Sequence, residues 1–142
     1  AIPEVLVPAI DAAYRTIAAA DGRAIGGLSR GGGWALRIGL QYPAVFAAIG
    51  LHSPAVLAPD LYYVPRWLEA IPAADQPRLW IDIGDRDPLL SSARELETIL
   101  EEEAIPFTWT LNPGRHEPAY WTGNLETYLR WYAEPWGAPE GS

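Results

Sequence analysis

A serine flanked by glycines, in the stretch Gly27-Leu28-Ser29-Arg30-Gly31, matches the pattern G-x-S-x-G. Enzymes with this pattern place the serine on a sharp turn between a strand and a helix, where its hydroxyl is exposed. We expect both glycines to be required, because a side chain at either position would collide with neighbouring backbone. A glycine-rich turn with an idle serine is the alternative. A phosphate-binding loop is excluded, because there is no G-x-G-x-x-G register and no Lys follows the G-x-x-x-x-G spacing. Ser29 is therefore the candidate nucleophile.

Two histidines could accept the proton of the serine hydroxyl, which is a weak nucleophile without a base. His116 lies in a glycine-containing loop after the last predicted strand and before the last predicted helix, and this context favours it as the base. His52 follows an earlier strand and precedes Ser53-Pro54. We expect His52 mainly to be a surface or strand-end residue satisfied by the backbone. Trp34 and His52 are the candidates for substrate contact.

A carboxylate must orient the base and stabilise its cation, and two aspartates compete for this role. Asp87 ends a G-x-x-D sequence after a predicted strand and is followed by Pro88. We therefore prefer Asp87 to Asp85, which is expected to hold a turn or cap a loop. Asp82 alternates within the strand and is expected to be structural. A metal site is set aside, because the histidines and aspartates show neither zinc-ligand spacing nor a calcium-loop pattern.

The order Ser29, Asp87, His116 along the chain is the order found in α/β-hydrolases and differs from that of chymotrypsin and subtilisin. It predicts acyl transfer, in which Ser29 attacks an ester carbonyl and His116 acts as general base and then as general acid. Asp87 would orient the histidine. The backbone N–H of Arg30 is expected to be one donor to the oxyanion.

Strands and helices alternate around these residues. A short apolar run predicts a buried parallel strand at residues 24–28, and further strands are predicted at residues 46–51, 78–83 and 106–111. Periodic segments and Pro or Gly boundaries predict helices at residues 3–20, 31–41, 61–70, 91–103 and 118–132. Connections longer than a hairpin predict a parallel sheet with right-handed crossovers, and hence a three-layer α/β fold of about four strands. Ligand sites in such sheets lie beyond the carboxyl ends of the strands, where the candidate serine, histidines and aspartate occur.

The 142 residues suffice for one domain, which we place at residues 1–136, followed by a disordered tail at 137–142. Ten arginines, no lysine and 18 acidic residues give a net charge of -8, which argues against nucleic acid or an anionic membrane as a partner. The absence of cysteine excludes disulfides and leaves the compartment open. No apolar run reaches the ~18 residues of a membrane span, and the N-terminus lacks signal-peptide features, so we expect a soluble chain.

Four segments resemble successive landmarks of the esterase branch of the α/β-hydrolases: AIGGLSRGGGWAL, YPAVFAAIGLHSP, WIDIGDRDPL and PGRHEPAYW. That branch includes enterochelin esterases, feruloyl esterases, S-formylglutathione hydrolases and mycolyltransferases. The resemblance covers most of residues 23–136. It implies a catalytic triad of Ser29, Asp87 and His116, no metal or organic cofactor, and hydrolysis of a small-molecule carboxylic ester. Arg30 stands where this group often has Met.

Only the C-terminal half of that fold is matched, and the chain has no Met at position 1, so we expect it to derive from a longer or processed product. The early strands and the loop that normally supplies a second oxyanion N–H lie outside the match. Residues 24–28 should then form an unprotected sheet edge, which predicts a homodimer. A small carboxylesterase without a lid is the expected function. A catalytically weak remnant that serves as an interaction module and an acyltransferase are the alternatives.

Overall fold

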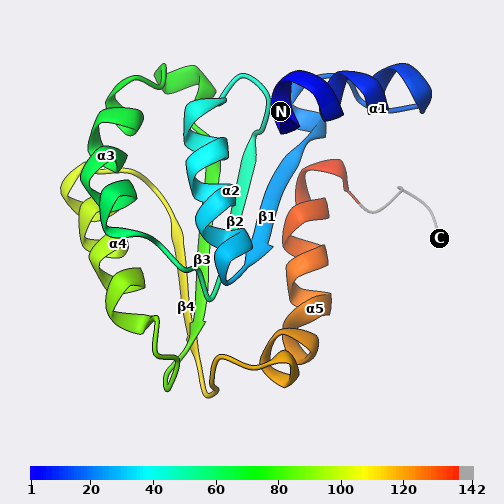
Figure 1. The fold of residues 1–142 in the computed structure, drawn as a ribbon. Helices are drawn as coiled ribbons and strands as arrows, with labels where there is room; N and C mark the ends of the chain where they lie inside the picture. Colours follow the sequence, from blue (N-terminus) through cyan, green and yellow to red (C-terminus); the bar gives the residue numbers. More distant parts are fainter. Residues whose placement is uncertain (138–142) are drawn as a thin grey trace.

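One parallel sheet of four strands forms the centre of the computed structural model, which describes residues 1–137 (Figure 1). The strands are β1 (Ala24–Leu28), β2 (Ala48–His52), β3 (Arg78–Gly84) and β4 (Thr108–Asn112), and they lie side by side in chain order. β1 pairs in parallel with β2 and forms one edge of the sheet, while β4 forms the other. The predicted parallel α/β architecture is confirmed.

Helices connect successive strands, as the length of the connections predicted. These are α2 (Arg30–Gln41), α3 (Ala58–Glu69) and α4 (Leu90–Glu102), and α5 (Pro118–Ala133) follows the last strand. Their bounds differ from the predicted ones by three residues or fewer. The largest difference is at the start of α3, where a proline in the first turn suits the helix because the missing N–H would have no partner there.

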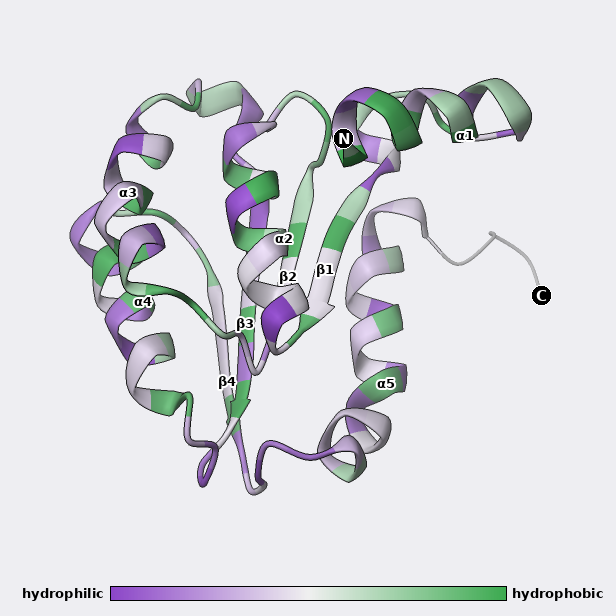
Figure 2. Ribbon diagram, viewed as in Figure 1, coloured by the Kyte–Doolittle hydropathy of each residue, from purple (hydrophilic) through white to green (hydrophobic). Residues whose placement is uncertain are grey.

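The hydrophobic core fills the face of the sheet that α2, α3 and α4 cover. Alternate residues of β2 and β3 point into it, because successive side chains of a strand point to opposite faces. The largest of its fully buried side chains are Leu36, Leu40, Ile49, Leu51, Val64, Leu79, Ile81, Leu96 and Leu100. Figure 2 shows hydrophobic residues on the strands, and both hydrophobic and hydrophilic residues on each helix. This core holds α2, α3 and α4 against the sheet, whose strand ends carry the candidate site residues.

α5 covers the opposite face of the sheet, against β1 and β2 (Figure 1). It packs closely because two strand positions are glycine. A Cβ atom on Gly26 would lie 1.7 Å from the hydroxyl oxygen of Tyr132, and one on Gly50 would lie 1.9 Å from it. The side chains between α5 and the sheet are largely aromatic and polar, which distinguishes this layer from the aliphatic core.

The N-terminal helix is shorter than the predicted span of residues 3–20. A π-helical turn (Ile2–Leu6) leads into α1 (Val7–Ala13), and the chain is extended immediately afterwards. Asp11 forms an ion pair with Arg23, the residue before β1, so the chain must fold back over α1 to reach the sheet. A helix continued to residue 20 would carry the chain away from that contact. The predicted stop near residue 21 instead lies in a separate 3₁₀ turn (Ala20–Gly22).

The chain after α5 makes one more turn (Glu134–Trp136), of the 3₁₀ type. The indole N–H of Trp136 donates to the carbonyl oxygen of Asp21, at 2.8 Å, which ties this turn to the 3₁₀ turn that precedes β1. The predicted tail at 137–142 lies, from residue 138 onward, outside the described residues. Across residues 1–137, none of the helices combines the length and the apolar character that crossing a bilayer requires.

Candidate active site

Ser29 lies at the turn between β1 and α2, at the carboxyl end of the sheet. Its φ of 52° falls in the left-handed region that residues other than glycine rarely adopt. Three backbone hydrogen bonds hold this conformation. The N–H of Ser29 donates to the carbonyl of His52 at 3.0 Å, and its own carbonyl accepts from Gly33 at 3.2 Å and from Ala55 at 2.8 Å. A strained turn fixed in this way is what a G-x-S-x-G sequence requires to present its hydroxyl.

The two glycines of the pattern differ in how strictly they are required. A Cβ atom on Gly27 would lie 2.3 Å from the carbonyl carbon of Gly31, so the prediction for Gly27 is confirmed. A Cβ atom on Gly31 would meet nothing within 4 Å, so the prediction for Gly31 is wrong for this chain. Gly31 is exposed on the first turn of α2, and the position that its Cβ atom would take faces open space. Gly33 has the close contact instead, because its Cβ would lie 2.3 Å from the carbonyl oxygen of Ala55.

Ser29, His116 and Asp87 come together from three different loops. The Nε2 atom of His116 lies 2.9 Å from the Oγ atom of Ser29. Its Nδ1 atom lies 2.9 Å and 3.1 Å from the two carboxylate oxygens of Asp87. The Asp87 side chain is fully buried, and it also accepts the N–H of Leu89 at 2.9 Å. With Nδ1–H donating to Asp87, the lone pair of Nε2 faces the serine hydroxyl, which is the tautomer that a general base needs.

Asp85 lies beside this group but holds the loop that carries His116. Its carboxylate accepts the N–H of Gly114 at 2.9 Å, and this hydrogen bond lowers the pKa of Asp85 below its ordinary value. The contact agrees with the turn-holding role predicted for Asp85. Although three aspartates occur close together in this part of the sequence, no group of three or more His, Asp or Glu side chains within residues 1–137 could hold a metal ion.

The two aspartates should therefore respond differently to removal of charge. We expect Asp87→Asn to lower kcat for ester hydrolysis by a factor of ~10⁴, because an amide at this position favours the wrong histidine tautomer. Asp85→Asn keeps an oxygen that can accept the N–H of Gly114, so it should retain most of the activity. Steady-state kinetics of both variants with one short ester tests this ranking. The reverse ranking would move the acid to Asp85.

Arg30 and Trp34 lie in the first turns of α2, which follows the candidate nucleophile Ser29. Arg30 is the first residue of the helix, so its N–H has no acceptor within the helix. Donation from this N–H to an oxyanion beside Ser29 stays a prediction. Trp34 is 56% exposed, and the guanidinium of Arg37 lies 5.4 Å from the centre of its ring. Arg30 and Trp34 line a pocket of about 360 Å³ beside the loop after β2. Contact between Trp34 and a substrate stays a prediction.

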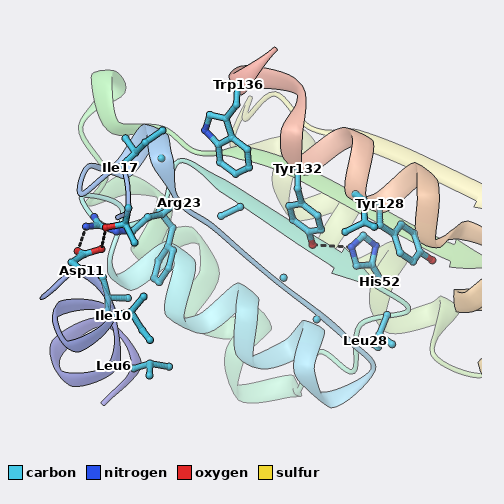
Figure 3. Close-up of a pocket in the computed structure, with 18 of the residues that line it drawn as sticks. Leu6, Ile10, Asp11, Ile17, Arg23, Leu28, His52, Tyr128, Tyr132 and Trp136 are labelled. Carbon is cyan, nitrogen blue, oxygen red and sulfur yellow. Dashed lines mark hydrogen bonds and ion pairs between the residues drawn. The ribbon is translucent and has the colours of Figure 1, made fainter. Parts of the chain in front are cut away.

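His52 lies outside the triad, in a buried polar network beneath α5 (Figure 3). Its Nδ1 atom is hydrogen-bonded to Asp82, and its Nε2 atom lies 2.8 Å from the hydroxyl of Tyr132. Asp82 also accepts from the hydroxyls of Tyr120, at 3.0 Å, and Tyr128, at 2.9 Å. Burial raises the pKa of each of these three tyrosines above its ordinary value, so they remain neutral donors.

This network corrects one expectation and agrees with another. The ring nitrogens of His52 are satisfied by side chains, so the expectation that the backbone satisfies them is wrong. The reason is tertiary: the aromatic partners come from α5, which is 80 residues away in the sequence for Tyr132. Asp82 is fully buried among its donors, in agreement with a structural role. Substrate contact by His52 stays a prediction, for a ring that is only 2% exposed.

Two residues beside the triad were not predicted to have any role. Ser53 follows β2 directly, is fully buried and has a φ of 47°. Trp121, in the first turn of α5, donates its indole N–H to the Oγ atom of Ser53 at 3.1 Å. The Trp121 ring also meets the ring of His116 edge to face, with the centroids 5.0 Å apart. The sequence signal was a Trp five residues after the candidate base, but nothing in the sequence alone places it against Ser53.

Comparisons with known sequences agree on one activity. The model of a family with the description "Putative esterase" matches residues 1–132. An esterase of Mycobacterium tuberculosis (strain H37Rv) is 44% identical over 63 residues, which are 44% of this chain and 14% of that protein. An esterase of the strain CDC 1551 of the same organism gives the same figures. The chain thus spans about a seventh of these curated relatives.

Solved structures share the fold at low sequence identity. A ferulic acid esterase is 23% identical with a TM-score of 0.78, and the match covers 92% of this chain and 58% of that one. S-formylglutathione hydrolase of Staphylococcus aureus is 21% identical with a TM-score of 0.76, covering 88% and 56%. The enterobactin esterase of Shigella flexneri is 22% identical with a TM-score of 0.80, covering 96% and 37%. The chain therefore spans less than two thirds of each of these structures.

Proposed function

The chain belongs to the family described as "Putative esterase", and we propose that it is a serine carboxylesterase acting on small, accessible esters. The observation that carries this proposal is the distance of 2.9 Å between Nε2 of His116 and Oγ of Ser29, on a histidine whose other nitrogen is bonded to a buried carboxylate. A serine paired with an oriented base is the arrangement that acyl transfer requires. An idle serine in a glycine-rich turn would need no such partner.

The geometry supports a two-step reaction. As the Ser29 oxygen bonds to the ester carbonyl carbon, Nε2 of His116 takes the hydroxyl proton, and Asp87 stabilises the imidazolium. The carbonyl oxygen becomes an oxyanion, to which the N–H of Arg30 would donate. The C–O bond to the alcohol then breaks, and His116 returns the proton to the departing alcohol. Water, activated by the same histidine, releases the acid and regenerates Ser29.

The proposed substrate class follows from the surroundings of the nucleophile. Ser29 is half-buried, and the neighbouring residue Arg30 lines a pocket of about 360 Å³ together with the exposed Trp34. A pocket of this size favours esters with a short or exposed acyl group, because it cannot enclose a long acyl chain. The substrates named for the similar structures differ from one another, so we assign none of them to this chain.

A fluorophosphonate probe together with a short p-nitrophenyl ester tests this proposal. Stoichiometric labelling at Ser29 with turnover of the ester is the expected result. Labelling with neither hydrolysis nor transfer would show an activated serine without turnover and contradict the hydrolase. Absence of both labelling and turnover would favour an interaction module instead. Transfer of the acyl group to added alcohols in preference to water would favour an acyltransferase.

We also propose that the chain forms a homodimer through the free edge of β1. The edge borders a groove of about 700 Å³ that runs from α1 to α5 along the strand (Figure 3). Leu28, Leu125 and Leu129 line it and are each at least two-fifths exposed. No lysine, proline or inward charge lies within β1 to prevent pairing. A second copy related by a two-fold axis would extend the sheet and bury these side chains on both copies at once.

Leu129→Lys should dissociate this dimer, because it puts a charge on the apolar side of the groove without touching the triad. Leu129 is 59% exposed, so the substitution should cost the monomer little stability. Tyr62→Lys is the matched control, since Tyr62 is 79% exposed on α3, away from the groove. Multi-angle light scattering should give twice 15.6 kDa for the unmodified chain and the control, and 15.6 kDa for Leu129→Lys. A monomeric unmodified chain would contradict the proposal.

A dimer would also bear on catalysis, because loss of one oxyanion donor costs about 2.7–4 kcal/mol of transition-state stabilisation. Within one copy, the N–H of Arg30 is the only oxyanion donor that we propose. A backbone N–H from a second copy, close to the shared edge beside Ser29, could supply another. If so, turnover per chain should fall in Leu129→Lys and should rise with protein concentration in the unmodified chain.

A further inference from the structure

We propose that Ser53 is a positioning residue for the catalytic base, acting through Trp121. The inference rests on the proposed function, since it assigns a role in the same site. Both ring nitrogens of His116 are already bonded, to Ser29 and to Asp87, but two hydrogen bonds leave the ring free to tilt about the line that joins them. The edge-to-face contact with Trp121 restrains that tilt.

Trp121 can restrain the histidine only if it is itself fixed, and Ser53 fixes it. The indole N–H donates to the Ser53 hydroxyl oxygen at 3.1 Å. Ser53 is rigid in turn, because it is fully buried and its N–H donates to the carbonyl of Asp82 on β3 at 2.7 Å. The restraint on the histidine thus originates in the sheet. It does not depend on the loop of residues 113–117, which carries the base.

The backbone of Ser53 is an independent sign that this position is specialised. Its φ of 47° is unfavourable for a residue other than glycine, and only two other such residues, Ser29 and Ala104, occur in the described part of the chain. Glycine would adopt the same backbone without strain. The backbone at this buried position would suit glycine better, so a serine there is explained if its hydroxyl is needed. The hydroxyl makes one side-chain hydrogen bond, and that bond is with Trp121.

The positioning role predicts a loss of rate without a loss of affinity. Ser53→Ala removes the acceptor, and Trp121→Phe removes the N–H while keeping an aromatic ring beside His116. Each should lower kcat by roughly 10- to 100-fold at unchanged KM, because a catalytic group displaced by about 1 Å costs this much. The double variant should be no slower than the slower single variant, because both changes break one interaction.

Tyr128→Phe is the matched control. It removes a buried hydrogen bond to Asp82, whereas the bond between Trp121 and Ser53 is partly buried. The aromatic contacts of Tyr128 are with His52 and Trp80 and not with His116. We expect Tyr128→Phe to lower the urea midpoint and to leave kcat unchanged under conditions where the protein is fully folded. Ser53→Ala with an unchanged kcat, or with a double variant whose losses multiply, would overturn the proposal.

Proton NMR separates this inference from the proposed function. The Nδ1–H proton of His116, bonded to Asp87, should give a downfield resonance that His116→Ala removes. In Ser53→Ala this resonance should broaden through exchange with water, and in Tyr128→Phe it should stay sharp. This result would support the inference even if no ester is hydrolysed. A resonance that remains sharp in Ser53→Ala would contradict it, whatever the activity.

Discussion

Ser29→Ala should lower the kcat of ester hydrolysis by a factor on the order of 10⁶, because removal of the nucleophile alone costs about as much as removal of the whole triad. The covalent step is then impossible, and no other described hydroxyl lies within hydrogen-bond distance of the Nε2 atom of His116. The fold should be unchanged. The substitution removes one half-buried oxygen, and alanine can keep the backbone hydrogen bonds that hold the turn.

Ser91→Ala provides a control of the same chemistry, since Ser91 is exposed in the first turn of α4. Initial rates with p-nitrophenyl acetate and urea unfolding curves should be recorded for both variants. We expect Ser91→Ala to match the unmodified chain in both. Substantial turnover by a correctly folded Ser29→Ala variant would end the esterase proposal.

His116→Ala should be as damaging as Ser29→Ala, with a loss of kcat again on the order of 10⁶. Without the imidazole, the serine proton has no acceptor, because the buried carboxylate of Asp87 contacts the histidine and the N–H of Leu89 but not the serine. The fluorophosphonate probe should also fail to label Ser29 at a measurable rate. This second readout depends on serine activation and not on how the ester binds.

The matched comparison for His116→Ala is the other histidine. His52→Ala removes one of three side-chain donors to the buried Asp82, so the variant should unfold more easily, by about 1–3 kcal/mol. Its kcat per folded molecule should stay near that of the unmodified chain. Tyr132→Phe, which keeps the ring of His52 but removes its partner hydroxyl, should behave in the same way with a smaller loss of stability. An indispensable His52 in a folded variant would show that the base is assigned wrongly.

The sequence by itself determined the layout of strands and helices and the three residues that we assign to the triad. Apolar runs separated by Gly and Pro predicted where the strands lie. The prediction that residues 24–28 form a buried strand is wrong, because β1 is an edge strand and its residues are half-buried or exposed, whereas the central strands β2 and β3 are buried. β1 was predicted to the residue, since it lies between Arg23 and the glycine-flanked Ser29. Each member of the triad follows a strand end, and parallel strands bring those ends to one edge. Local patterns were sufficient for these features.

Only the tertiary structure decided how the site is supported. Tyr132, a partner of His52, and Trp121, the partner of Ser53, come from α5, and no local pattern encodes a contact across 80 or 68 residues. The same holds for the end of α1, where the pairing of Asp11 with Arg23 prevails over helix propensity. Gly31 is the opposite case. The G-x-S-x-G pattern predicted that only glycine fits there, but a Cβ atom on Gly31 would meet no described neighbour within 4 Å. Periodicity and turn chemistry are properties of adjacent residues, whereas packing and buried hydrogen bonds exist only once distant segments meet.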